Sequence, residues 1–317
     1  MKEGSNIRFL KSNQVDLKKW DLCIDHSANG KMYAYSWFLD IVSPDWDALV
    51  WGDYQYVMPL TTRKSYGFKM MLQPVATQQL GIFSPFDISA DIVNSFMKEI
   101  NSRFKLVNIL LNSRNHYQGS NFLSQNRSNY TLTLDKSYEL ISQNYSNNTK
   151  RNIKKALSKD LYVFDLYDID RFIELLINNA APDYKGYYQK NRRTIERLIS
   201  FASKRKMASI LGVYDSTNNL CAAACFFEVM GISYYLFACS TPSGKDQQAM
   251  YLLVDHYIKN HCEQDITIDF EGSNKDGIAR FYRSFGGAHE QYQCLQSSYY
   301  RFLLNIKNRL IRKRNTE

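Results

Sequence analysis

The stretch that decides the fold is IDFEGSNKDGIARFYRSFGG, residues 268–287. At its start Ile268 and Phe270 alternate with Asp269 and Glu271, which predicts a strand with two carboxylates on one face. A Gly-Ser-Asn break follows. Apolar residues then recur at helical spacing until a pair of glycines ends the run. The stretch therefore predicts a strand, a tight turn and a helix.

The same order of parts occurs twice in the chain. In each half, three strand-like segments lead to a loop, an amphipathic helix and a further strand. Phe83 corresponds to Cys239 and Val107 to Ile266, and the two pairs have nearly the same separation, which indicates a duplicated α/β unit. The predicted segments are 48–52, 54–62, 67–74, 88–104 and 105–113 in the first half, and 208–215, 221–229, 232–240, 247–262 and 266–273 in the second.

Between the two halves lies a predicted helical insertion. Its candidate helices span residues 149–159, 168–179 and 187–206, and Asp168 is the expected N-cap of the second. We place the domain boundary at the turn-like Asp-Lys-Ser near residue 136. The predicted domains are therefore 1–136 and 137–317.

Composition limits the classes of protein. The chain has 317 residues, of which 44% are hydrophobic, so it can bury a core. It has no apolar run long enough to span a membrane and no signal-peptide pattern, so we expect a cytoplasmic protein. The scattered cysteines match no zinc spacing, so we expect buried thiols in a reducing compartment and no metal. They are Cys23, Cys221, Cys225, Cys239, Cys262 and Cys294.

The net charge of +9 is concentrated in basic patches at 150–159, 190–197 and 305–317. Such patches suit anionic partners, including nucleic acid, phosphates or a membrane face. The alternative is that each patch is only the solvated face of a helix.

The final helix reads Ala279-Arg-Phe-Tyr-Arg-Ser-Phe-Gly. With the preceding order of elements, it resembles the core of GNAT acyltransferases. Two such units, with KRNIKKA at 150–156 opening the second, resemble the Fem family of aminoacyl ligases, bacterial enzymes that add amino acids to a peptidoglycan precursor. The resemblance implies an α/β fold of mixed sheets, built as tandem GNAT-like domains with a helical insertion.

The resemblance, together with the chemistry of acyl transfer, assigns roles to two residues. Glu271, at the carboxyl end of its strand, is the predicted base, and Asp269 would raise its pKa by like-charge repulsion. Tyr282 is the predicted acid and stands where many Fem ligases have a lysine. The alternatives are that the acids face solvent or pair with arginines, and that Tyr282 is only a packed aromatic.

The loop at 243–249 departs from the coenzyme A motif [QR]-x-x-G-x-[GA] of GNAT enzymes, although backbone N–H groups can hold a pyrophosphate without it. Its predicted cofactor-binding residues are Gly244, Lys245, Gln247, Gln248 and Ala249. The predicted substrate-binding residues are Asp269, Arg151, Lys155, Lys275 and Arg283. We expect no tightly bound cofactor, and acyl-CoA or aminoacyl-tRNA as co-substrate.

The sequence is compatible with three functions. The first is a transferase that moves an acyl or aminoacyl group onto an amine, in a small molecule or a cell-envelope precursor. The second is a catalytically silent GNAT-like protein that binds a ligand. The third is a nucleic-acid-binding module, although no aromatic RNA-binding motif occurs. A tRNA partner and a peripheral membrane contact are compatible with the basic patches.

Overall fold

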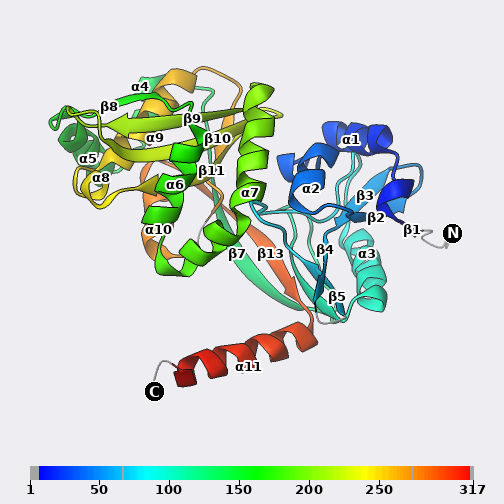
Figure 1. The fold of residues 1–317 in the computed structure, drawn as a ribbon. Helices are drawn as coiled ribbons and strands as arrows, with labels where there is room; N and C mark the ends of the chain where they lie inside the picture. The colour runs from blue at the N-terminus through cyan, green and yellow to red at the C-terminus, as the bar shows by residue number, and fades with distance from the viewer. Residues whose placement is uncertain (1–6, 66–67, 273, 315–317) are drawn as a thin grey trace. The chain divides into compact units, whose positions relative to one another are not determined.

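The computed structural model describes residues 7–65, 68–272 and 274–314. The chain forms two compact units, one of residues 1–127 with 291–317 and one of residues 128–290 (Figure 1). This division differs from the predicted one at residue 136. The C-terminal segment returns to the first unit because strand β13 (Ala288–Gln296) pairs with β6 (Leu106–Leu110).

The first unit contains two groups of strands. Strands β1, β2 and β3 form an antiparallel sheet, and β4, β5, β6 and β13 follow one another in a mixed arrangement in which β5 and β6 are parallel. The remaining strands and the helices of this unit are β1 (Ile7–Leu10), β2 (Asp47–Trp51), β3 (Tyr56–Leu60), β4 (Thr62–Ser65), β5 (Phe68–Leu72), α1 (Leu17–His26), α2 (Ser36–Val42), α3 (Ala90–Arg103) and α11 (Ser298–Arg314), with 3-10 turns at Ser12–Gln14 and Met32–Ala34.

Helix α3 confirms the helix predicted at 88–104. It begins after Ser89, whose hydroxyl accepts the Ile92 N–H at 3.4 Å and so satisfies one of the unpaired donors of the first turn. Its apolar side buries Phe96 and Ile100 in the core of the first unit.

The second unit is built on a six-strand run in the order β7, β12, β11, β10, β9, β8. Only β11 and β12 are parallel, and the other described neighbours are antiparallel. The mixed sheet of the predicted fold class is therefore confirmed. The strands are β7 (Leu123–Thr133), β12 (Thr267–Asp269), β11 (Ile232–Ser240), β10 (Leu220–Val229), β9 (Ala208–Tyr214) and β8 (Tyr162–Asp165).

The helices of the second unit include the predicted insertion. Asp168 caps the middle helix of this insertion as expected, because its carboxylate accepts the Arg171 N–H at 2.9 Å. Helix α9 packs against β9 and β10, with Tyr257 stacked on Phe226 at 3.7 Å between ring centroids. The helices are α4 (Tyr138–Gln143), α5 (Asn147–Leu157), α6 (Ile169–Asn179), α7 (Pro182–Lys204), α8 (Pro242–Asp246), α9 (Ala249–His261) and α10 (Asp276–Ser284).

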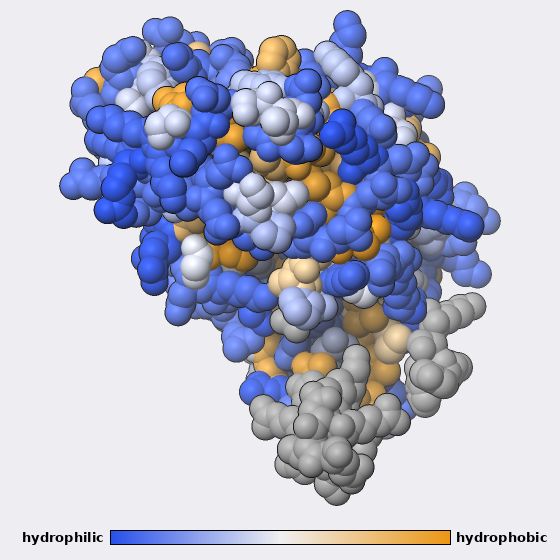
Figure 2. Space-filling model, turned by 60° about the vertical axis from the view of Figure 1, so that its left-hand side comes forward, coloured by the Kyte–Doolittle hydropathy of each residue, from blue (hydrophilic) through white to orange (hydrophobic). Residues whose placement is uncertain are grey.

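Figure 2 shows one face, on which hydrophobic residues lie in patches between hydrophilic ones. Five of the six cysteines are buried free thiols, and Cys262 is partly exposed. Within the described ranges, none of the helices combines the length and the apolar character that crossing a bilayer requires.

Candidate active site

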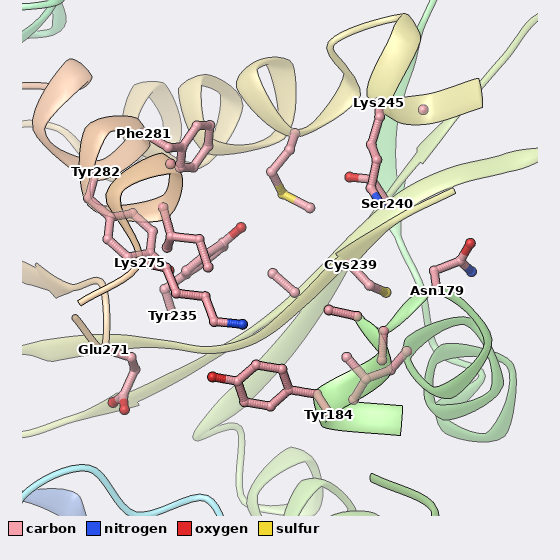
Figure 3. A pocket seen from close by; sticks show the side chains of 18 of the residues that line it. Asn179, Tyr184, Tyr235, Cys239, Ser240, Lys245, Glu271, Lys275, Phe281 and Tyr282 are labelled. Atoms are coloured by element: carbon pink, nitrogen blue, oxygen red, sulfur yellow. The ribbon is translucent and has the colours of Figure 1, made fainter. Parts of the chain in front are cut away.

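A cavity of about 650 Å³ lies within the second unit. Its walls come from α6, α7, β11, the start of α9 and α10, and Figure 3 shows how their side chains converge. Most of the lining is aromatic or aliphatic, with a few polar groups, as is usual for ligand sites. The lining includes Tyr184, Tyr188, Tyr235, Leu236, Ala238, Gly244, Lys245, Gln248, Glu271, Lys275 and Tyr282.

The cavity opens where two parallel strands separate. The register of β11 with β12 ends at Tyr234 opposite Asp269, whereas β11 continues to Ser240. Residues of this continuation, including Tyr235 and Ser240, line the cavity. Opposite β10 the register shifts so that Leu236 is an extra residue on β11. The strand therefore presents a bulged stretch of backbone to the cavity.

Strand β12 ends earlier than predicted, and the prediction that Asp269 and Glu271 extend from one strand face is wrong. The Asp269 carboxylate accepts the Glu271 N–H at 3.0 Å, and Glu271 has a φ of 61°. A left-handed conformation breaks the two-residue alternation of a strand. Asp269 is 1% exposed and lies outside the cavity lining, whereas Glu271 is part of it.

The backbone at Glu271 is strained. A residue other than glycine in the left-handed region costs of order 1–3 kcal/mol, and such residues cluster at functional sites. Glu271, the predicted base, lines the cavity together with residues of α10. Its catalytic role stays a prediction.

Tyr282 contributes a buried phenol to the cavity. Its ring stacks on Phe270 at 4.9 Å and meets Tyr235 edge-on at 6.1 Å between centroids. Burial, and then the charge of Glu271, raise the pKa of Tyr282 above its ordinary value of 10.0. The phenol is therefore protonated throughout the physiological pH range and is available as a hydrogen-bond donor.

A lysine and two phenols from neighbouring elements face the same cavity. The Lys275 ammonium lies 4.6 Å from the centroid of the Tyr184 ring, a cation–π distance, and Figure 3 shows the two side chains together. Burial raises the pKa of Tyr188, which also comes from α7. The aromatic wall of α7 was not predicted, although the cluster of tyrosines in YKGYY at 184–188 was a visible signal.

The segment 243–249, predicted as a loop, is mostly helix α8, and only some of its residues line the cavity. Gly244, Lys245 and Gln248 line the cavity, whereas Gln247 and Ala249 do not. Gln248 has a φ of 62° and precedes α9, so the positive end of a 13-residue helix lies beside Lys245. Ala249 is fully buried, and the Gln247 amide donates to Ser243 at 2.8 Å.

Gly244 is required for the packing of α8 against β10. A Cβ at this position would lie 2.1 Å from the Cys221 carbonyl oxygen of β10. The Gly244 N–H donates to the Thr241 hydroxyl at 3.0 Å, so it already has a partner. The glycine therefore sets how closely α8 approaches the sheet.

We expect Gly244→Ala to lower the free energy of unfolding by about 1–3 kcal/mol, because backbone atoms must move to accommodate the added methyl group. Thermal and urea denaturation measure the change. The matched control is Gly186→Ala in α7, where a Cβ would meet nothing within 4 Å. This control should gain up to about 1 kcal/mol, and equal effects of the two substitutions would contradict the packing role.

The other predicted substrate-binding residues lie outside the cavity lining. Arg151 and Lys155 are exposed on α5, and the Arg151 guanidinium donates to Asn148 at 2.8 Å. Arg283 is exposed on α10, and its side chain donates to the Ala279 carbonyl at 3.4 Å. Their roles stay predictions. Among the described residues, no group of three His, Cys, Asp or Glu side chains is placed to hold a metal ion.

Comparison with solved structures identifies the fold. FemX superimposes with a TM-score of 0.59 at 11% identity, over 90% of this chain and 96% of FemX. A tandem GNAT protein from the clavulanic acid biosynthesis pathway gives a TM-score of 0.52 at 10% identity, over 92% of this chain and 98% of that one. L-PGS from Bacillus licheniformis gives 0.50 at 9% identity, over 89% and 92%.

The chain has a tandem GNAT-like fold of the Fem type. No protein-family model matches the sequence, and no curated protein matches it. At these identities the Fem-type fold fixes the architecture, and the activity has to be argued from the cavity itself.

Proposed function

We propose that this protein transfers an acyl or aminoacyl group to an amine, in the cavity of its second unit. The observation that carries the proposal is that Glu271 and Tyr282 line one cavity, which opens where β11 and β12 separate and which residues at the start of α9 also line. Acyl transfer needs a base, a hydrogen-bond donor to the carbonyl oxygen or the leaving group, and a binding place for an anion.

The donor would be an acyl-CoA or an aminoacyl-tRNA, both of which carry phosphates. The positive end of α9 and the Lys245 ammonium favour an anion at that wall. The continuation of β11 beyond Tyr234 offers backbone N–H and C=O groups to an extended chain, as an open sheet edge does. The donor's carbonyl would then lie near Leu236, on the side of Tyr282.

The proposed reaction balances protons between two residues. The amine attacks the carbonyl carbon of the donor, and Glu271 accepts the proton that the forming C–N bond releases. The tetrahedral intermediate collapses and expels a thiolate or a ribose oxygen, which takes the phenol proton of Tyr282. Transfer of the proton from Glu271 to Tyr282 through solvent restores both residues. The products are an amide and a thiol or hydroxyl compound.

The proposed acceptor and setting of the reaction come from the resemblance to the Fem family. We propose a bacterial cytoplasmic enzyme whose acceptor is an amine of a small molecule or of a cell-envelope precursor. The aromatic wall of Tyr184 and Tyr188, together with the Glu271 carboxylate, suits an organic ammonium group before its deprotonation.

The alternative is a GNAT-like protein that binds a ligand without catalysis. The observation that favours it is the occupied N–H of Gly244, which removes one phosphate donor from the loop. Binding alone does not separate the two functions, because both require ligand in the cavity.

We expect a thermal-shift screen to identify the donor. A ligand present at one hundred times its dissociation constant should stabilise the protein by about 2.7 kcal/mol. The panel contains acetyl-CoA, longer acyl-CoAs and non-hydrolysable aminoacyl-tRNA analogues, with free phosphate as a control. Lys245→Gln should raise the dissociation constant of the same ligand about tenfold and so reduce the thermal shift. No response to any member of the panel would count against both donors.

A further inference from the structure

Helix α11 exposes an apolar stripe that no part of the proposed reaction uses. Tyr299, Phe302, Leu303 and Ile306 are 54%, 59%, 42% and 40% exposed. Their spacing of i, i+3, i+4 and i+7 places them along one face of the helix. Scattered exposed apolar residues need no explanation, but a contiguous stripe marks an interaction surface.

The opposite side of α11 is attached to the first unit. The Ser297 hydroxyl accepts the Val107 N–H at 3.2 Å and donates to the Lys105 carbonyl at 2.8 Å, which ties the start of the helix to β6. Tyr300 and Leu304 are half-buried, and Asn108 donates to the Tyr300 hydroxyl at 3.4 Å. The stripe therefore faces away from this contact, and Figure 1 shows α11 projecting from the strands of its unit.

The charge of α11 indicates the partner. The segment Ser298–Arg314 contains six basic residues and no Asp or Glu. A helix that exposes an apolar stripe and whose sequence is rich in Lys and Arg, with low net hydrophobicity, has the pattern of a helix that lies in a membrane interface. The basic residues are Arg301, Lys307, Arg309, Arg312, Lys313 and Arg314.

We propose that α11 docks the protein on an anionic lipid bilayer, with Tyr299, Phe302, Leu303 and Ile306 inserted at the level of the headgroups. The basic residues would meet the lipid phosphates. The helix lies on the surface rather than across it, because no described helix meets the requirements of a membrane span. This inference is independent of the proposed acyl transfer.

A second copy of the chain is the main competing occupant of the stripe. In a pair of α11 helices packed stripe to stripe, each helix would carry six basic residues and no acid to compensate them. The net charge of such a pair opposes association. Nucleic acid would also match the charge, but phosphates give no reason for four exposed apolar side chains.

The test is co-sedimentation of the full chain with vesicles. We expect binding to vesicles of phosphatidylglycerol and phosphatidylcholine, at least tenfold weaker binding to pure phosphatidylcholine, and weakening as salt rises. The double variant Phe302→Asp with Ile306→Asp should reduce binding to the anionic vesicles at least tenfold. The double variant Lys307→Gln with Arg309→Gln should weaken binding to the anionic vesicles and leave the weak binding to pure phosphatidylcholine unchanged.

The matched control is Leu22→Asp with Leu140→Asp, which alters two leucines that are 57% and 50% exposed on α1 and α4. This control should bind vesicles as the original chain does. The variants of Phe302 with Ile306 and of Leu22 with Leu140 should keep the original melting temperature within a few degrees, because they change exposed side chains. Equal losses in control and test variants would overturn the proposal. So would a dimer in analytical ultracentrifugation that Phe302→Asp with Ile306→Asp converts to a monomer without any vesicle binding.

Discussion

Tyr282→Phe should lower kcat by two to four orders of magnitude, which is the usual contribution of a general acid. The substitution keeps the ring that stacks on Phe270 at 4.9 Å and removes only the hydroxyl. The free energy of unfolding should therefore change by about 1 kcal/mol. Steady-state turnover with the donor found by the thermal-shift screen measures the first effect, and chemical denaturation measures the second.

The pH dependence gives a second readout for Tyr282. Because its pKa is raised above 10.0, the phenol keeps its proton, and the rate of the unaltered enzyme should not fall between pH 7 and about pH 9. Tyr130→Phe is the matched control, since its ring lies 6.2 Å from that of Tyr282 but is not part of the cavity lining. Unchanged turnover in Tyr282→Phe would remove the residue from the mechanism.

Glu271→Gln should also lower kcat/KM by two to four orders of magnitude, because an amide has the shape of the carboxylate but accepts no proton. The left-handed backbone of residue 271 is unchanged in this variant, so the fold should be kept.

The control for Glu271 is Asp276→Asn, which removes a nearby negative charge at the start of α10. Asp276 is not part of the cavity lining, so this variant should change the rate by only a few-fold. If Glu271→Gln kept the original rate, the base would have to be another group. If both variants lost equal activity, the effect of Glu271 would be the general field of its charge.

Local patterns allowed much of the fold to be predicted. Helices α3 and α6 follow from apolar spacing, and the Asp168 cap follows from its place before an apolar run. The duplicated order of strands and helices led to the tandem fold. Glu271 and Tyr282 were predicted from the resemblance to GNAT and Fem enzymes together with the chemistry of acyl transfer, and both line the cavity.

The features that were missed depend on contacts between distant segments. The early end of β12 follows from the hydrogen bond between Asp269 and the Glu271 N–H, which alternation of residue types does not reveal. The packing role of Gly244 depends on Cys221 in another strand. The return of β13 to β6 depends on pairing across most of the chain, between Cys294 and Leu110. The periodicity of a sequence indicates the type of each element, but not which distant strands pair with one another.

The most direct test of acyl transfer is mass spectrometry of the acceptor after incubation with a donor that stabilises the protein. We expect an amide product to form with the unaltered chain. The amount formed in the same time should fall by at least a hundredfold with Tyr282→Phe or Glu271→Gln. A donor that binds with the expected thermal shift, while no amine in a panel of small-molecule and envelope-precursor acceptors gains its acyl group, would contradict the account and favour a ligand-binding protein.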